Sequence, residues 1–149
     1  MPIAMTYRKG SDIVLEAWVG RISVVEAFEH ERDHLQDPDY PHAARVLADL
    51  TGAVMSPEIG PSFIAEFTGL YREYPEKMWG TRVAIVATEE WNTAKNYERA
   101  SELQRLNMSV VVFTNLWTAC TWLGIDVEPT KKWIDETRAR LLGEGTVVV

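Results

Sequence analysis

The segment HERDH, from His30 to His34, has the histidine spacing of a zinc site. On a helix, residues four apart share a face, so His30 and His34 could bind one metal ion while Glu31 acted as general base. That arrangement would make the protein a zinc hydrolase. The apolar pattern argues against it, because both histidines lie about 200–240° around the helix from Phe28. Tyr40 also stands where an extended zinc-protease pattern has its third histidine. We therefore expect an exposed helix face and no bound metal, with the zinc hydrolase as the least favoured alternative.

Ser56 is the second candidate, in the stretch LTGAVMSPEIGPSF. A serine followed by Pro57 and Glu58 is typical of a helix N-cap, whose hydroxyl accepts a bond from a backbone N–H of the first turn. Because Pro61 has no N–H, the regular helix is expected to start near Gly60 or Pro61. The alternative is phosphorylation of Ser56, since a phosphate is favoured at a helix N-terminus.

The only cysteine, Cys120, lies among apolar residues with no histidine near it in sequence, which predicts a buried structural thiol. A single cysteine cannot form an internal disulfide and indicates a reducing, cytoplasmic setting. The chain has no glycine-rich phosphate loop and no serine-hydrolase elbow. We expect no catalytic residues and no cofactor.

The composition restricts the partners that the protein could bind. The 149 residues carry a net charge of −7, and the basic residues are mixed with acidic ones. This disfavours nucleic acids and acidic membrane surfaces. No segment approaches the length of apolar sequence that spans a bilayer. The six tryptophans are expected mostly in the core. An exposed apolar surface near the C-terminus is the alternative. The TVVV tail could add a strand to an edge of its own sheet, or to that of a second copy in a homodimer.

Strand and helix patterns alternate along the chain and predict a single α/β layer domain. An N-terminal hairpin comes first, and Ser23 with Glu26 forms a capping box that starts a helix at Val24. Leu50 to Gly52 is interpreted as a turn. The sheet is expected to be mixed, because the hairpin makes the first strand antiparallel to the second. The five predicted strands are Thr6–Arg8, Ile13–Val19, Arg45–Leu50, Arg82–Thr88 and Ser109–Thr114.

About four helices are expected to flank this sheet, followed by an extra C-terminal helix. They begin at Val24, near Pro61, near Glu90 and at Leu116, with Asn115 or Thr114 as the cap of the last of these and Gly124 at its end. The extra helix should run from about Pro129 to Leu142, with Trp133, Ile134, Thr137 and Leu141 on one side. We predict a core domain over residues 1–126, with a helix and apolar tail over 127–149 packed on it.

The order of these segments resembles the STAS-like domains, in particular the SpoIIAA-like branch, which are relatives of bacterial anti-sigma-factor antagonists. LADLTG after the central strand and FTNLWTACTWLG near the end carry the resemblance, which covers Thr6 to Ile125. It implies a five-stranded mixed sheet with four helices, shared in outline with CRAL-TRIO lipid carriers, and no catalytic residues. It also places the regulatory serine of the family at Ser56, although Met55 and Pro57 differ from the family's Asp-Ser-Ser-Gly turn.

The resemblance and the missing catalytic motifs favour a non-enzymatic module that binds a protein partner. The binding surface would lie around the turn from Thr51 to Gly60, with Thr51, Ser56, Glu58 and Phe63 as binding residues. The identity of the partner does not follow from the sequence.

A carrier of small apolar ligands is the alternative from a different functional class. Its pocket would lie between the sheet and the helices, lined by aromatic side chains at Phe63, Phe67, Trp91 and Trp117.

Overall fold

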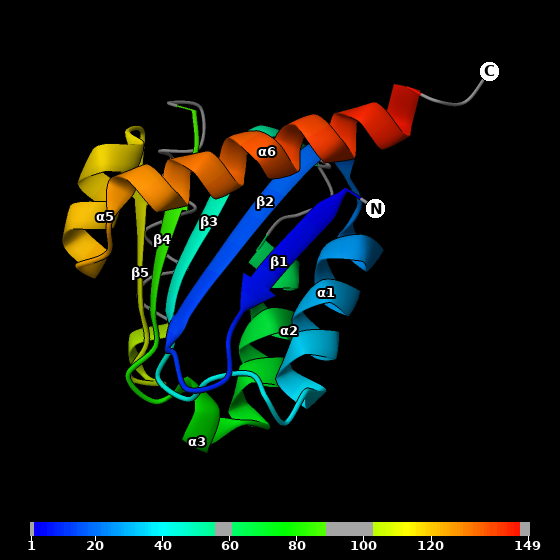
Figure 1. The fold of residues 1–149 in the computed structure, drawn as a ribbon. Coiled ribbons are helices and arrows are strands. Elements are labelled where there is room, and N and C mark those ends of the chain that lie inside the picture. The colour runs from blue at the N-terminus through cyan, green and yellow to red at the C-terminus, as the bar shows by residue number, and fades with distance from the viewer. Residues whose placement is uncertain (1, 56–60, 89–102, 147–149) are drawn as a thin grey trace.

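The computed structural model describes residues 2–55, 61–88 and 103–146. These residues form one five-stranded sheet with the strands in sequence order from edge to edge (Figure 1). Strand β1 is antiparallel to β2, and all other neighbours are parallel. The predicted mixed α/β sheet is therefore confirmed. The strands are β1 (Ile3–Tyr7), β2 (Ile13–Ile22), β3 (Arg45–Met55), β4 (Arg82–Val86) and β5 (Ser109–Phe113).

The central strand β3 is longer than predicted, and the interpretation of Leu50 to Gly52 as a turn is wrong. These residues lie inside β3, where Leu50 and Thr51 face the single residue Trp18 of β2. This is a β-bulge, which adds one residue to a strand and bends it without ending it. A polar residue and a glycine after an apolar run are typical of a strand end, and here they mark the bulge.

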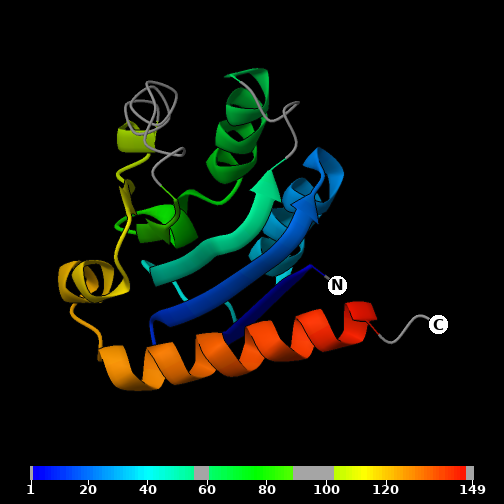
Figure 2. The ribbon, with the colours of Figure 1, turned by 90° about the horizontal axis from the view of Figure 1, so that it is seen from above.

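The helices cover both faces of the sheet. Helices α1 (Val24–Gln36) and α2 (Pro61–Arg72) lie on one face, while α5 (Leu116–Leu123) and α6 (Val127–Thr146) lie on the other (Figures 1 and 2). The short α3 (Pro75–Met78) leads into β4. Two apolar clusters fill the two layers, one under α1 and α2 and one under α5 and α6. None of the helices in these ranges is long and apolar enough to cross a membrane.

The helix ends follow the local chemistry of the sequence. Ser23 and Glu26 form the predicted capping box at the start of α1. Helix α2 is described from Pro61, the first described residue after Met55, so its start near Gly60 or Pro61 stays a prediction. Asn115 caps α5, and Gly124 ends it at φ 71°, a backbone conformation that favours glycine. The predicted helix from Glu90 to Leu106 lies mostly outside the described residues.

Helix α6 crosses the sheet on the face opposite to α1 (Figure 2). Its buried side is the predicted one, with Ile134, Thr137 and Leu141 buried and Trp133 half-buried. It extends four residues beyond the predicted end at Leu142. Thr146 of the TVVV tail belongs to this helix, and the three terminal valines lie outside the described residues.

Candidate functional site

A group of polar side chains lies where α6 passes the carboxyl end of β3. Arg138 of α6 donates a hydrogen bond from Nη1 to Thr51 Oγ1 at 3.2 Å, across 87 residues of sequence. The Thr51 hydroxyl donates in turn to Asp49 Oδ1 at 2.8 Å. A Cβ at Gly52 would lie 3.2 Å from Arg138 Nη2, so glycine allows the guanidinium to lie close over the strand. The bulge and the glycine together position this contact.

Asp49 is the buried member of the group. Its Oδ2 has no hydrogen-bond partner among the described residues, and Arg138 Nη1 lies 3.8 Å away. A buried carboxylate is costly unless it is paired, and Arg138 supplies the nearby positive charge. The guanidinium of Arg138 therefore contacts the exposed Thr51 and also lies near the buried Asp49.

Two further exposed residues lie on the same pair of strands, three residues beyond this contact on β3 and opposite it on β2. Arg21 of β2 pairs in register with Val54 of β3, so both side chains point to the same face of the sheet. Arg21 is exposed, and Val54 has 62% of its surface exposed. Thr51 is exposed, and about a third of the Arg138 side chain is accessible to solvent. We call Arg21, Thr51, Val54 and Arg138 the edge patch.

The residues predicted to bind a partner have different places in the structure. Thr51 lies in the edge patch, on a strand and not in a turn. Ser56 and Glu58 lie outside the described residues, so neither capping by Ser56 nor its phosphorylation is tested here. Phe63 belongs to the first turn of α2, and its side chain is also outside the described part of the chain.

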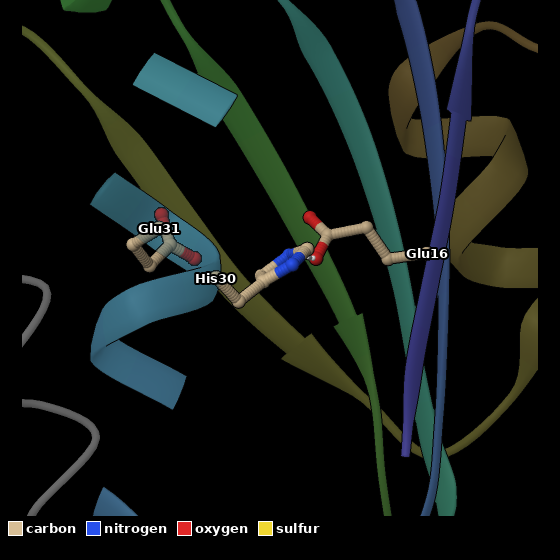
Figure 3. Close-up of side chains that lie close together, drawn as sticks. All are labelled: Glu16, His30 and Glu31. Atoms are coloured by element: carbon tan, nitrogen blue, oxygen red, sulfur yellow. Dashed lines mark hydrogen bonds and ion pairs between the residues drawn. The ribbon is translucent and has the colours of Figure 1, made fainter. Parts of the chain in front are cut away.

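A second polar group is enclosed between β2 and α1. Figure 3 shows the carboxylate of Glu16 reaching from β2 to the imidazole of His30 on α1, where Oε1 and Nε2 lie 2.5 Å apart. The two side chains are only 5% and 13% exposed. His34 Nε2 lies 3.3 Å from Glu31 Oε2, with the side chains 4% and 15% exposed. We call Glu16, His30, Glu31 and His34 the buried cluster.

The prediction that His30 and His34 occupy an exposed helix face is wrong. His34 is buried with Ala27 and Leu35, and His30 packs its ring against Trp18. The error came from centring the buried face on Phe28, which is only half-buried. At 100° per residue, the buried residues Ala27, His34 and Leu35 lie within about 100° of one another around the helix, so the buried face includes His34.

Aromatic side chains orient the members of the buried cluster. The indole N–H of Trp18 donates to Glu16 Oε1 at 3.1 Å, and the Tyr71 hydroxyl donates to Glu31 Oε2 at 2.9 Å. The ring of Tyr40 stacks on His34 with centroids 4.5 Å apart. His34 Nδ1 is the one buried ring nitrogen in the described ranges without a hydrogen-bond partner. Both carboxylates therefore have fixed outer contacts, whereas His34 has a free nitrogen.

The contacts of Glu16 with His30 and of Glu31 with His34 shift the pKa values of His30 and Glu31. Burial alone would lower the pKa of His30, but the charge of Glu16 and its hydrogen bond raise it to about 9. Burial opposes ionisation of Glu31, but the charge and hydrogen bond of His34 lower the pKa of Glu31 to about 2. At neutral pH, His30 is an imidazolium and Glu31 a carboxylate.

The raised pKa of His30 predicts that stability depends on pH. The pKa rises from 6.5 to about 9 on folding, so the stabilisation is complete below pH 6.5 and is lost as the pH rises through 9. At about 1.4 kcal/mol for each pKa unit, the free energy of unfolding should fall by about 3 kcal/mol over that window. Urea unfolding in the presence of EDTA at several pH values measures this fall in the free energy of unfolding. His30→Gln should lack most of the fall, and an equal fall in both proteins would contradict the assignment.

The arrangement differs from that of a zinc hydrolase built on His30, Glu31 and His34. The Nε2 atoms of the two histidines contact different carboxylates, Glu16 and Glu31. Glu31, the expected general base, accepts a hydrogen bond from Tyr71. Within the described ranges, one group of three residues has possible ligand atoms that all lie within 4.8 Å of one another, and it consists of Glu16, His30 and Glu31. The buried cluster therefore does not reproduce the HExxH geometry.

The remaining candidates are placed as follows. Cys120 is buried as predicted, and burial raises the pKa of its thiol, which disfavours a nucleophile. Phe67 packs in the apolar cluster under α1 and α2, whereas Trp117 is exposed on α5, on the other face. Trp91 lies outside the described residues. The structure thus does not bring Phe67 and Trp117 together as walls of one carrier pocket.

Sequence reasoning missed Glu16, Asp49 and Arg138. The first two could have been found, because each occupies an inward position of a strand: Glu16 lies between Val14 and Trp18, and Asp49 follows Leu47 by two. A carboxylate in the buried alternation of a strand is unusual and indicates a partner. Arg138 gives no such signal, because it is one charged residue among many on α6.

Comparison with known proteins gives a match among solved structures. No family model matches the sequence, and no curated protein is significantly similar to it. Among solved structures, the fold matches an uncharacterised protein of the DUF3478 family with a SpoIIAA-like fold from Shewanella loihica PV-4. The TM-score is 0.48 at 17% sequence identity, over 81% of this chain and 93% of that chain.

Proposed function

We propose that the protein is a non-enzymatic module that binds another protein through the edge patch. The observation that carries this proposal is the contact between Arg138 and Thr51, which holds a cation and a hydroxyl in the carboxyl-terminal half of β3. In open α/β sheets, ligands bind toward the carboxyl ends of the parallel strands. Loops and strand ends there can vary without disturbing the core.

The chemistry of the edge patch favours an acidic partner segment with a neighbouring apolar side chain. Arg21 and Arg138 carry guanidinium groups, which bind carboxylates and phosphates well. Val54 offers an exposed apolar surface next to Arg21 in the sheet. Both cations belong to a protein with a net charge of −7, so an acidic partner would be attracted to this edge and repelled from much of the remaining surface.

The state of the candidate catalytic groups supports binding over catalysis. Glu31 is engaged by His34 and Tyr71, and His30 is engaged by Glu16. Cys120 is buried with a raised pKa. These groups lie inside the fold, whereas the edge patch is exposed.

Capture followed by measurement of affinity tests the proposal. The immobilised protein is used to capture partners from the source cells, and each captured protein is purified for direct binding. Arg21→Glu and Val54→Glu should each weaken binding at least about tenfold, because they place a negative charge within the contact. Added salt should also weaken binding to the wild type.

Arg105→Glu is the matched control for Arg21→Glu, since it makes the same charge change at an exposed position four residues before β5. It should leave the affinity within about twofold of the wild type, as expected for a surface charge outside the contact. If all three variants bound every captured protein with the affinity of the wild type, the proposal would be contradicted. Equal weakening by Arg105→Glu would show an effect of net charge and would also contradict it.

A further inference from the structure

We propose that Glu16, His30 and Glu31 form a site for a divalent transition-metal ion such as zinc. This inference goes beyond partner binding and does not depend on it. The site lies inside the layer between β2 and α1 (Figure 3), whereas Arg138 belongs to α6 on the other face of the sheet (Figure 2).

The geometry of the donor atoms carries the proposal. One oxygen of Glu16, one oxygen of Glu31 and one ring nitrogen of His30 all lie within 4.8 Å of one another. In a tetrahedral zinc site with bonds of about 2.0–2.1 Å, donor atoms lie about 3.4 Å apart. Small side-chain rotations would bring the longer separations to that value, and the 2.5 Å contact between Glu16 and His30 would open by about 1 Å. An imidazole with two carboxylates is a donor set suited to zinc and neighbouring divalent metals.

The surroundings of the donors resemble the outer shell of a metal site. Trp18 donates to Glu16 and Tyr71 donates to Glu31, so each carboxylate is held by a neutral donor while keeping oxygen lone pairs free. All three donor side chains are largely buried, which excludes competing water. The site is therefore oriented by side chains that carry no charge of their own.

His34 is the independent sign of an unused donor in the same place. Its ring lies 5.0 Å from that of His30, and it is nine-tenths buried. Its Nδ1 has no partner among the described residues, while its Nε2 lies 3.3 Å from Glu31. A buried imidazole nitrogen without a hydrogen-bond partner is unusual in a protein core. Beside a metal held by Glu16, His30 and Glu31, this ring would be a neighbour of the His30 ligand.

The charges balance when a divalent ion binds. Without metal, one proton lies in the 2.5 Å contact between Glu16 Oε1 and His30 Nε2. Binding replaces that proton: bonds form from the metal to His30 Nε2 and to a Glu16 oxygen, and the proton leaves to solvent. Two carboxylates, a neutral imidazole and a divalent cation then give a buried site with no net charge.

Titration of the full chain with zinc chloride tests the site. The protein is treated with EDTA, freed of it, and titrated in a calorimeter at pH 7.5. We expect one zinc ion per chain with a micromolar or tighter dissociation constant. Glu16→Gln and Glu31→Gln should each weaken binding at least about tenfold, because each replaces an anionic ligand. Glu29→Gln, at an exposed position of the same helix, should bind as the wild type does. Absence of saturable binding, or equal affinity in Glu16→Gln and Glu29→Gln, would overturn the proposal.

A measurement on the unmodified protein keeps the test independent of whether the variants fold. The chain has three histidines, His30, His34 and the exposed His42, and their ring proton signals can be assigned by NMR. One equivalent of zinc should shift the His30 signal and leave that of His42 unchanged. A shift confined to His42 would show surface binding and would overturn the proposal.

Discussion

Replacing Glu16 by leucine should lower the free energy of unfolding by about 3 kcal/mol, whereas replacing both Glu16 and His30 by leucine should cost about 1 kcal/mol. The single change removes the carboxylate that raises the pKa of His30 to about 9. His30 must then either stay charged without a partner inside the core or lose its proton at neutral pH. Both outcomes remove the free energy that the pKa shift represents.

The double change removes the charge together with its partner. Two leucines can pack in the apolar layer that already contains Val14 and Trp18. The remaining cost arises because the indole N–H of Trp18 loses its hydrogen-bond acceptor on Glu16. Replacing a buried pair by apolar residues is often neutral, while breaking it costs several kcal/mol.

Urea unfolding at pH 7 in EDTA measures both costs, together with that of His30→Leu to complete the double-mutant cycle. Glu29→Leu, at an exposed position of α1, is the control and should change stability by less than about 0.5 kcal/mol. Additive costs of the two single changes in the double variant would show that Glu16 and His30 do not interact.

Leu47→Ala should also cost about 3 kcal/mol, for a different reason. Leu47 is fully buried on the central strand β3 and packs in the apolar cluster with Leu123 of α5 and Ile134 of α6. Truncation removes the apolar contacts and leaves a cavity that a close-packed layer cannot fill. This layer positions α6, so the contact of Arg138 with Thr51 depends on it.

The matched control for this change is Leu142→Ala, which makes the same truncation at an exposed position of α6. Thermal and urea unfolding should show a change below about 0.5 kcal/mol for Leu142→Ala. A cost below about 1 kcal/mol for Leu47→Ala would contradict the close packing of this layer.

Much of the fold could be predicted because its signals are local. The capping box of Ser23 and Glu26 and the cap of α5 at Asn115 depend on residues within one turn of helix. The buried side of α6 follows from the spacing of Ile134, Thr137 and Leu141. Such patterns repeat at the period of the element that forms, so the sequence alone contains them.

The sites could not be predicted in the same way, because their contacts join distant segments. Arg138 and Thr51 are 87 residues apart, and the bulge that presents Thr51 depends on the neighbouring strand. The buried stripe of α1 was assigned to Val24, Phe28 and Leu35, and measuring its angle from the half-buried Phe28 put His30 and His34 on the wrong side. The packing of α1 against β2, where Glu16 supplies a partner for His30, fixed the orientation instead.

Hydrogen–deuterium exchange on the complex with a captured partner tests most directly whether the edge patch is the binding surface. The partner should slow exchange in peptides that contain Thr51 to Met55 and in those that contain Arg138, while peptides around Arg105 exchange as in the free protein. Protection confined to other surfaces, such as the exposed Trp79 after α3, would contradict the account.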